Sequence, residues 1–250
     1  MEEIRENRKP VVEITNLYKS YGSNKVLDAF NLKLYEGENL VVMGKSGSGK
    51  SVMIKCLIGL EEPDSGSISI MGQAIKTLSR EELDELRTEI GFLFQGSALY
   101  DSMSVRENLE FPLRRHTKKF GVIKDTTPLV MEALQNVGLA HAIDLMPNEL
   151  SGGMKRRVAL ARTLILQPKI ILYDEPTTGL DPITAKEIIL LMKNIQQQYK
   201  TSSIIITHDV DCARVISNRM ILLVDGTNYA EGTFDELKAL KDEKVQAFFK

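Results

Sequence analysis

The sequence predicts an α/β fold with a mostly parallel core sheet, an N-terminal antiparallel β region and an inserted helical subdomain. Two observations support this prediction. Short apolar runs typical of strands alternate with helical spacing near the start of the chain and again after residue 168. Between about residues 96 and 162, only helical patterns follow one another. Strands that alternate with helices are typical of βαβ units, which build parallel sheets.

The apolar patterns define the expected elements. Strands are expected at 11–17 and 26–34, on either side of a turn at 22–24, and at 39–43, 67–71, 169–173, 203–207 and 220–224. Helices are expected at 51–60, 105–115, 128–137, 154–166, 182–199 and 236–250. The length of 250 residues suits a single domain over 1–250, with the helical subdomain inserted at approximately 96–162.

Composition indicates an ordinary soluble globular protein and argues against a nucleic-acid partner. The chain is 43% hydrophobic and 26% charged. Its formal net charge of -2 provides no overall basic field for DNA or RNA. The two cysteines, Cys56 and Cys212, lie far apart without CxxC spacing, which is typical of reduced thiols in a cytosolic protein.

The sequence shows neither a membrane span nor a signal peptide. No apolar run approaches the roughly 18 to 20 residues that a spanning helix requires. Residues 1–5 alternate in charge and lack the apolar core of a signal peptide. We therefore expect the chain neither to cross a membrane nor to be secreted, so any membrane-spanning part belongs to another polypeptide.

A glycine-rich loop lies between the strand at 39–43 and the helix at 51–60. Its residues are Gly44, Lys45, Ser46, Gly47, Ser48, Gly49, Lys50 and Ser51, a full match to G-x-x-x-x-G-K-[ST]. Glycines let successive backbone N–H groups surround phosphate oxygens, and the next helix points its positive end at the same anion. We expect Lys50 to reach the β and γ phosphates and Ser51 to ligate Mg²⁺. The flanking strand and helix argue against a turn without a ligand.

Two acids, Asp174 and Glu175, end an apolar strand. A strand that is apolar on both faces lies centrally in a parallel sheet, with its carboxyl end at the ligand crevice. We expect Asp174 to hold Mg²⁺ through water and Glu175 to polarise the water that attacks the γ-phosphate. Alone, this pattern fits helix-capping acids equally well; beside the phosphate loop, the catalytic interpretation is favoured.

The segment Leu150-Ser151-Gly152-Gly153-Met154 distinguishes this chain from other P-loop proteins. It opens a helix shortly before the carboxylate strand and resembles the LSGGQ signature of ABC ATPases. Other features of that family appear in the same order: Tyr21 matches the adenine-stacking aromatic, Gln95 the Q-loop glutamine, residues 179–181 the D-loop and His208 the switch histidine. The resemblance implies a P-loop NTPase of the ABC type that binds ATP and Mg²⁺ and hydrolyses ATP.

The resemblance also implies a role for each matching residue. The implied catalytic residues are Lys50, Gln95, Glu175 and His208, and the implied metal contacts are Ser51, Gln95 and Asp174. Further nucleotide contacts are Tyr21, the loop residues 44–51, Val52, Gln95, Ser151, Gly152, Gly153, Asp174 and His208. In the known ABC arrangement, Ser151 and Gly153 contact the γ-phosphate bound by the partner subunit, so ATP holds a homodimer together. Gln95 connects the phosphate site to the helical subdomain.

Two residues depart from the family pattern. Val52 stands where the family usually has Thr or Ser, which removes one hydroxyl contact to phosphate. Met154 replaces the signature glutamine and removes an amide near the ribose or phosphate across the interface. Because Ser151 and Gly153 remain, we expect altered ATP affinity or closure and retained catalysis.

Met154 also points to a subfamily. Together with residues 93–99, 101–102, 105, 107–108, 112–113 and 181–184, it resembles the ATPase of Mla-type lipid transporters. These bacterial systems use MCE (mammalian cell entry) proteins to move phospholipid between envelope membranes. The resemblance implies a place on the cytoplasmic face of the inner membrane, a multi-pass permease and an MCE-type lipid-binding protein; some members also have a small STAS-type subunit. No long extension follows the helix expected at 236–250, which leaves contacts through such a tail in doubt.

Three alternatives to this function remain open. The first is an ABC ATPase for another solute, such as an amino acid, or for a peptide exporter. The second is a soluble ABC protein acting on DNA or the ribosome, which usually has long coiled-coil insertions or two ATPase domains that this chain lacks. The third is a general P-loop kinase or GTPase, which the segment 150–154 and the absence of an Asn-Lys-x-Asp segment argue against.

Overall fold

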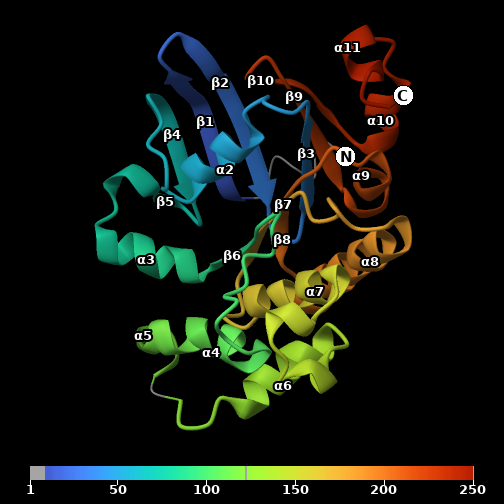
Figure 1. Ribbon diagram of the computed structural model, residues 1–250. Helices are drawn as coiled ribbons and strands as arrows, with labels where there is room; N and C mark the ends of the chain where they lie inside the picture. Colours follow the sequence, from blue (N-terminus) through green and yellow to red (C-terminus); the bar gives the residue numbers. More distant parts are fainter. Residues whose placement is uncertain (1–8, 122, 250) are drawn as a thin grey trace.

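The computed structural model describes residues 9–121 and 123–249. Residues 1–5, which were expected not to belong to a signal peptide, lie outside these ranges. The labels used below are those of Figure 1.

The main sheet has six strands in the order β10-β9-β3-β8-β7-β6. Their bounds are β3 Asn39–Gly44, β6 Ile90–Leu93, β7 Ile170–Asp174, β8 Ser202–Ile206, β9 Arg219–Val224 and β10 Thr227–Gly232. All neighbours in the sheet are parallel except β10, which runs antiparallel to β9 at one edge. The mostly parallel core sheet predicted from the sequence is therefore confirmed. Strands β3, β7 and β8 are buried in the middle of the sheet, and for β7 the apolar run had predicted this central place.

A second, antiparallel sheet precedes and partly covers the first. Its order is β2-β1-β4-β5, with bounds β1 Pro10–Tyr21, β2 Asn24–Tyr35, β4 Ser65–Ile70 and β5 Gln73–Ala74. This confirms the predicted N-terminal antiparallel region. Strands β1 and β2 each run several residues longer than their apolar alternation indicated, because the hairpin stays paired out to Tyr21 and Asn24.

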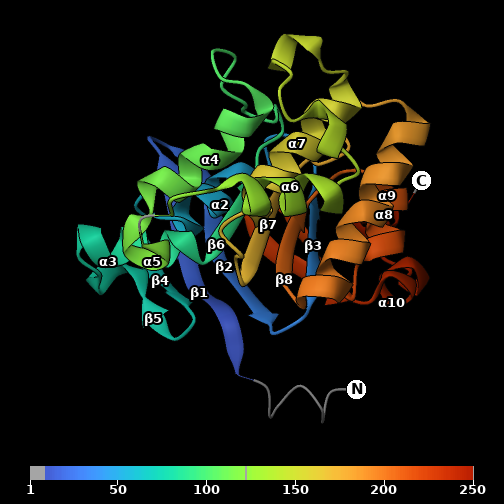
Figure 2. The same ribbon diagram turned by 90° about the horizontal axis from the view of Figure 1, so that it is seen from below.

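The helices cover both faces of the main sheet. They are α2 Lys50–Leu57, α3 Arg80–Thr88, α4 Val105–Arg115, α5 Thr117–Phe120, α6 Thr127–Asn136, α7 Gly152–Leu164, α8 Pro182–Tyr199, α9 Val210–Ile216, α10 Phe234–Ala239 and α11 Glu243–Gln246. Three 3₁₀ turns, Ile75–Thr77, Ala140–Ala142 and Pro147–Glu149, complete the connections. Figures 1 and 2 both show α4, α6 and α7 grouped together; α4 and α6 lie within the segment expected to be helical, and α7 extends two residues beyond it.

Alternation along the central strands divides the interior into two cores. Val41 and Met43 of β3 join a core with buried side chains of α4, α6, α7 and α8. Leu40 and Val42 point to the opposite face and pack with α2 and the antiparallel sheet. Because successive strand residues face opposite sides, one strand supplies both cores. Strand β3 and the loop that follows it are therefore held from both faces.

The structure differs from the sequence-based expectation in several elements. Strands β5, β6 and β10 and helices α3, α5 and α9 were not expected; α3 is marked by a capping box between Ser79 and Glu82. The single helix expected at 236–250 is wrong, since α10 and α11 are separate. Leu240 adopts extended backbone, and Asp242 starts α11 by accepting a hydrogen bond from the Val245 N–H at 3.0 Å. Residue 250 lies outside the described ranges.

Across residues 9–121 and 123–249, none of the helices combines the length and the apolar character needed to cross a bilayer.

A buried arginine fastens the main sheet at the opposite end from the phosphate loop. Arg219 begins β9, beside Leu40 of β3, and its side chain is only 3% exposed. Its guanidinium bonds both carboxylate oxygens of Glu38, at 2.7 and 2.9 Å, and also Glu231 and the carbonyl of Lys33. A buried charge requires such partners, since desolvation is otherwise uncompensated. Arg219 thereby connects β2, β3, β9 and β10.

Replacing Arg219 by Met should lower the free energy of unfolding by about 3 kcal/mol, because it leaves the largely buried carboxylate of Glu38 without its partner. Chemical denaturation of the purified chain measures this loss. The control is Arg214→Met, which removes an exposed ion pair with Asp211 on α9 and should change stability by less than about 1 kcal/mol. Equal stability of the two variants would show that the Arg219 cluster contributes little.

Candidate nucleotide site

The phosphate loop follows β3 directly and leads into α2. Gly49 has φ 102°, and a Cβ at this position would lie 2.7 Å from the carbonyl oxygen of Val26. A Cβ on Gly44 would lie 2.4 Å from Ser48 Oγ and 2.9 Å from the carbonyl oxygen of Leu223. Gly49 is required because of its positive φ and because a side chain would clash with the backbone of Val26. Gly44 is required because a side chain would clash with Ser48 and Leu223. The hydroxyl of Ser48 is buried and has no hydrogen-bond partner among the described residues. An oxyanion in the loop would supply one.

The side chain of Lys50 is folded back under the loop. Lys50 is 8% exposed, and its ammonium donates to the carbonyl of Gly44 at 2.7 Å and to that of Lys45 at 3.0 Å. Burial lowers the pKa of Lys50, while the nearby carboxylates of Glu175 and Asp174 act in the opposite direction. A terminal phosphate beside this ammonium would favour its charged form further. Lys50, which was predicted to contact phosphate, is the first residue of α2 and lies directly after the loop.

The two acids lie where β7 ends. Burial raises the pKa of Asp174, with Glu175 contributing in the same direction and Lys50 opposing it. A divalent cation would stabilise the ionised carboxylate and so reverse this shift. Glu175 lies one residue beyond the strand at φ 49°, with its N–H bonded to the carbonyl of Ile206 in β8 at 2.9 Å. This left-handed conformation is uncommon for a side chain of its size and turns Glu175 out of the strand direction.

His208 and Glu175 are in direct contact. Nδ1 of His208 lies 2.8 Å from Oε2 of Glu175. The histidine side chain is 68% exposed, whereas that of the glutamate is 13% exposed. His208 reaches this position because β8, which precedes it, is the parallel neighbour of β7. With Nδ1 engaged by the carboxylate, Nε2 remains for an external ligand. The structure thus brings together Lys50, Asp174, Glu175 and His208, four residues for which a role at the nucleotide was expected.

Gln95 lies in the loop after β6, exposed to solvent. Its carbonyl accepts a hydrogen bond from Arg156 of α7, while its side chain forms no hydrogen bond with any of the described residues. The loop continues through Ser97 and Ala98, both left-handed at φ 61° and 48°, whose carbonyls accept from Arg162. The structure therefore anchors the backbone of this loop to α7.

Ser151 caps the N-terminus of α7, its hydroxyl accepting from the Met154 N–H at 3.2 Å. Ser151 and Gly152 are exposed, and a Cβ on Gly153 would lie 2.6 Å from Thr184 Cγ2. Figure 1 shows α7 among the helices below the sheet and α2 beside the antiparallel strands, so the two helix N-termini belong to separate parts of the molecule. The side chain of Met154 packs against the core that contains α7 rather than standing free at the surface.

The remaining predicted residues belong to β1, to the first turn of α2 and to the loop itself. Tyr21 ends β1 and is 47% exposed, with the ammonium of Lys19 5.2 Å from its ring centre. Ser51 is exposed in the first turn of α2, and Val52 packs against the core beneath the loop. Residues 45–48 also line a cavity of about 430 Å³ whose other walls include Asp225, Lys244 and Phe248.

The donor set fits Mg²⁺ bound together with a phosphate ligand. Within residues 9–121 and 123–249 there is no group of three or more His, Cys, Asp or Glu side chains that could hold a metal by itself. Mg²⁺ usually keeps several waters and takes one or two carboxylates plus substrate phosphates. The exposed hydroxyl of Ser51 and the half-buried carboxylate of Asp174 suit that mode.

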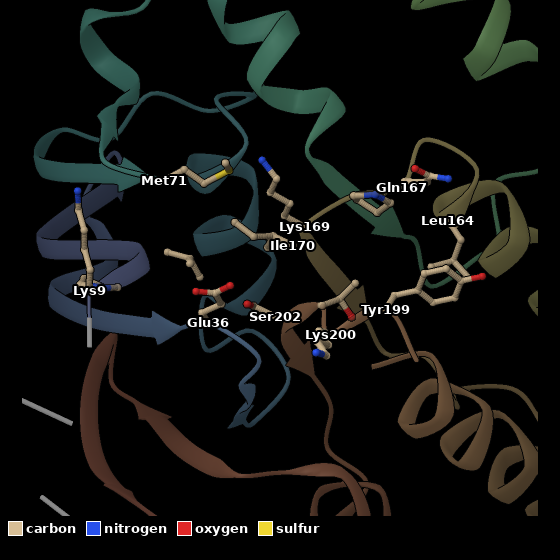
Figure 3. A pocket seen from close by; sticks show the side chains of 14 residues that line it. Lys9, Glu36, Met71, Leu164, Gln167, Lys169, Ile170, Tyr199, Lys200 and Ser202 are labelled. Carbon is tan, nitrogen blue, oxygen red and sulfur yellow. The ribbon is translucent and has the colours of Figure 1, made fainter. Parts of the chain in front are cut away.

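A second cavity, of about 780 Å³, lies away from these residues, at the amino ends of β7 and β8 (Figure 3). Three lysines line it, Lys9, Lys169 and Lys200, but Figure 3 shows that their ammonium groups do not converge on a common point. Lys169 is already paired with Glu89 at 3.3 Å. In parallel α/β sheets ligands bind at the carboxyl ends of strands, so this cavity is not the nucleotide site.

Two residues in contact with the site were not predicted from the sequence. Thr178 donates from its hydroxyl to Oε2 of Glu175 at 3.3 Å. Arg156, buried in α7, donates to the carbonyls of Phe94, Gln95 and Thr178. Thr178 follows Glu175 by three residues, and a search for hydroxyls near the base would have found it. Arg156 has no sequence signal, since its partners are backbone atoms of distant loops.

Comparison with known proteins agrees with this geometry. The family model for ABC transporters matches residues 27–178. A probable ribonucleotide transport ATP-binding protein of Mycobacterium leprae is 45% identical over 213 residues, which cover 85% of this chain and 60% of the relative. The ATP-binding protein of an intermembrane phospholipid transport system from Haemophilus influenzae is 39% identical over 241 residues, covering 96% of this chain and 90% of the relative. A methionine import ATP-binding protein of Campylobacter jejuni is 37% identical over 252 residues, covering 95% and 75%.

A solved ATP-binding cassette, a dimer described in a post-hydrolysis state with bound ADP and Pi, superposes with a TM-score of 0.80. It is 35% identical, and the match covers 89% of this chain and 98% of that one. The chain spans about three fifths of the length of the Mycobacterium leprae relative. With the phosphate loop, the carboxylate pair and the capped α7 in the positions described above, these matches show that the chain belongs to the ABC transporter family.

Proposed function

We propose that this chain binds Mg-ATP at the phosphate loop and hydrolyses it to ADP and phosphate. The observation that supports this most directly is the contact between His208 and Glu175 beside the buried ammonium of Lys50. It combines a base, a group that orients the base and a cation for the terminal phosphates within one edge of the sheet. Such a set is typical of phosphoryl transfer, where positioning and charge stabilisation provide most of the catalysis.

In the proposed reaction, the oxygen of a water attacks the γ-phosphorus while Glu175 accepts the proton of that water. The bond between the γ-phosphorus and the bridging oxygen breaks, and its electron pair leaves with ADP. Lys50 exchanges the carbonyls of Gly44 and Lys45 for the β and γ phosphate oxygens, and Nε2 of His208 holds the γ-phosphate. Ser51 and Asp174 would hold Mg²⁺, which would neutralise part of the phosphate charge.

The site is proposed to be completed by a second copy of the chain. Ser151 and Gly152 form the exposed N-terminus of α7. Among the described residues, neither contacts the phosphate loop of its own chain. Backbone N–H groups and the dipole of a 13-residue helix form a ready anion site. In a head-to-tail homodimer, each α7 would reach the γ-phosphate held by the other copy. The dimeric solved cassette supports this arrangement.

We propose that the helical segment 96–162 and the groove beside it connect this chain to the membrane part of a transporter. A cavity of about 290 Å³ is lined by Leu60, Arg87, Phe92 and His116, between the end of α2 and helices α3 and α4. Leu60 is 61% exposed there, so an apolar side chain is available to a partner. We propose that a helix of a membrane permease binds in this groove. Closure around ATP would move the helical segment through the loop at Gln95.

Phospholipid is the proposed cargo. The Haemophilus influenzae relative of an intermembrane phospholipid transport system matches over nearly its full length, and the Met154 signature and the segment 93–99 resemble Mla-type ATPases. In this proposal the chain works on the cytoplasmic face of the inner membrane with a permease, an MCE-type lipid-binding protein and, in some systems, a STAS-type subunit. Methionine import is the alternative, favoured by the Campylobacter jejuni relative.

The variant Glu175→Gln should retain ATP binding and lose turnover by about 10²-fold or more, because the general base is removed while the site keeps its shape. Steady-state phosphate release measures turnover, and sedimentation with Mg-ATP should show a trapped dimer. Glu187→Gln, which changes an exposed carboxylate on α8, is the matched control and should behave like the unmodified chain. Near-normal turnover of Glu175→Gln would exclude Glu175 as the base.

The cargo can be tested on detergent-solubilised membranes that contain the tagged chain. We expect a multi-pass permease, an MCE-type protein and phospholipid to co-purify, identified by mass spectrometry. Leu60→Glu should reduce capture of the permease, because it replaces the exposed apolar side chain of the groove by a charged one, whereas Leu190→Glu at an exposed position of α8 should not. A permease that instead arrives with a methionine-binding protein would contradict the phospholipid assignment.

A further inference from the structure

Arg156 is a buried cation whose surroundings contain no countercharge. It lies on the second turn of α7, 4% exposed. Within the described parts of the chain, no carboxylate lies within ion-pair distance of its guanidinium; instead Nη1 donates to Phe94 O at 2.7 Å, and Nη2 donates to Gln95 O and, at 3.4 Å, to Thr178 O. Burial lowers the pKa of Arg156, although arginine stays charged in proteins. A buried charge compensated only by carbonyls is costly, so its partners need explanation.

These carbonyls belong to two loops that lie far apart in the sequence. Phe94 and Gln95 follow β6, whereas Thr178 follows β7 by four residues. Arg156 is the residue of α7 that bonds both loops. Its planar fork of donors is suited to holding two backbone segments at a fixed spacing. Any movement of α7 relative to the sheet therefore acts on both loops together.

Thr178 carries this connection to the proposed base. Its carbonyl accepts from Arg156, its N–H donates to Glu175 O at 3.2 Å, and its hydroxyl donates to Glu175 Oε2 at 3.3 Å. The same Oε2 lies 2.8 Å from Nδ1 of His208. Two donors from different loops therefore converge on one carboxylate oxygen. The other oxygen, Oε1, has no such partner among the described contacts and is left for the water.

We propose that Thr178 is a positioning residue for Glu175 and that Arg156 fixes Thr178 to α7, so that the placement of the base depends on the placement of the signature helix. This inference rests on the proposed role of Glu175 and names two further residues that act through it. A carboxylate held by both His208 and Thr178 has one orientation; held by His208 alone, it can rotate about its terminal bond. Catalysis should then fall, while ATP binding should not change.

The test uses the full chain and separates kcat from KM. Thr178→Val keeps the shape and removes the hydroxyl, so kcat should fall about tenfold, the scale of one hydrogen bond to a charged group, with KM for ATP within about twofold. Thr178→Ser should restore kcat. Arg156→Met should lower kcat in the same way, and Arg156→Lys should restore part of it. Thr163→Val on α7, whose hydroxyl bonds only the carbonyls of Ala159 and Phe92, is the control for loss of a hydroxyl.

The decisive comparison is made in the Glu175→Gln background. If Thr178 acts through the carboxylate, adding Thr178→Val to Glu175→Gln should leave the residual rate unchanged within about twofold. An equal further loss in the double variant, or a kcat of Thr178→Val equal to that of Thr163→Val, would overturn the proposal. High activity of Glu175→Gln itself would instead reject the proposed base. Melting temperatures near that of the unmodified chain show that the variants are folded. If Thr178→Val is unstable, the kcat values of Arg156→Met and Arg156→Lys provide the test instead.

Discussion

The site depends on one constraint: the carboxyl ends of three adjacent parallel strands must meet at the same edge of the sheet. Strand β3 delivers the phosphate loop, β7 delivers Asp174 and Glu175, and β8 delivers His208. The strand order β3-β8-β7 places the histidine strand between the other two. Without that strand order, the loop, the two acids and the histidine would not lie together, whatever their local sequence. The two cores on either side of the sheet hold the strands in it.

The charges at this edge are poorly matched until a ligand binds. Burial lowers the pKa of Lys50 and raises that of Asp174, so each group is held in an environment that disfavours its charged form. Lys50 bonds carbonyls of its own loop, and the Ser48 hydroxyl lacks a partner among the described residues. A triphosphate would place further negative charge beside Lys50 and a hydrogen-bond partner beside Ser48, and Mg²⁺ would place further positive charge beside Asp174. The preorganised loop thus favours nucleotide and metal together over either alone.

Much of this site could be predicted from the sequence because its residues are local to motifs. The glycines of the loop, the acids after an apolar strand and the serine before α7 are each marked by their immediate neighbours. The central place of β7 was predicted for the same reason, since its unbroken apolar run at 170–173 indicates burial on both faces. The subunit partner, cargo and domain boundaries are not fixed by such local signals.

What sequence reasoning missed depends on distant contacts. Strand β6 has only four residues and is defined by pairing with β7, and the C-terminal segment breaks at Leu240 because Asp242 caps a separate helix while accepting a hydrogen bond from Tyr229. Arg156 bonds loops more than 20 residues away on either side. Residues of this kind have no pattern of their own, and only the folded chain shows what they hold.

The central claim is that each nucleotide site is shared between two copies, with the phosphate loop from one and the α7 N-terminus from the other. It is tested most directly by the ATPase activity of a mixture of Lys50→Ala and Ser151→Arg chains, each inactive by itself. A mixed dimer contains one site with both Lys50 and Ser151 intact, so the account predicts that activity returns on mixing. No return of activity, in a sample where mixed dimers are shown to form, would contradict it.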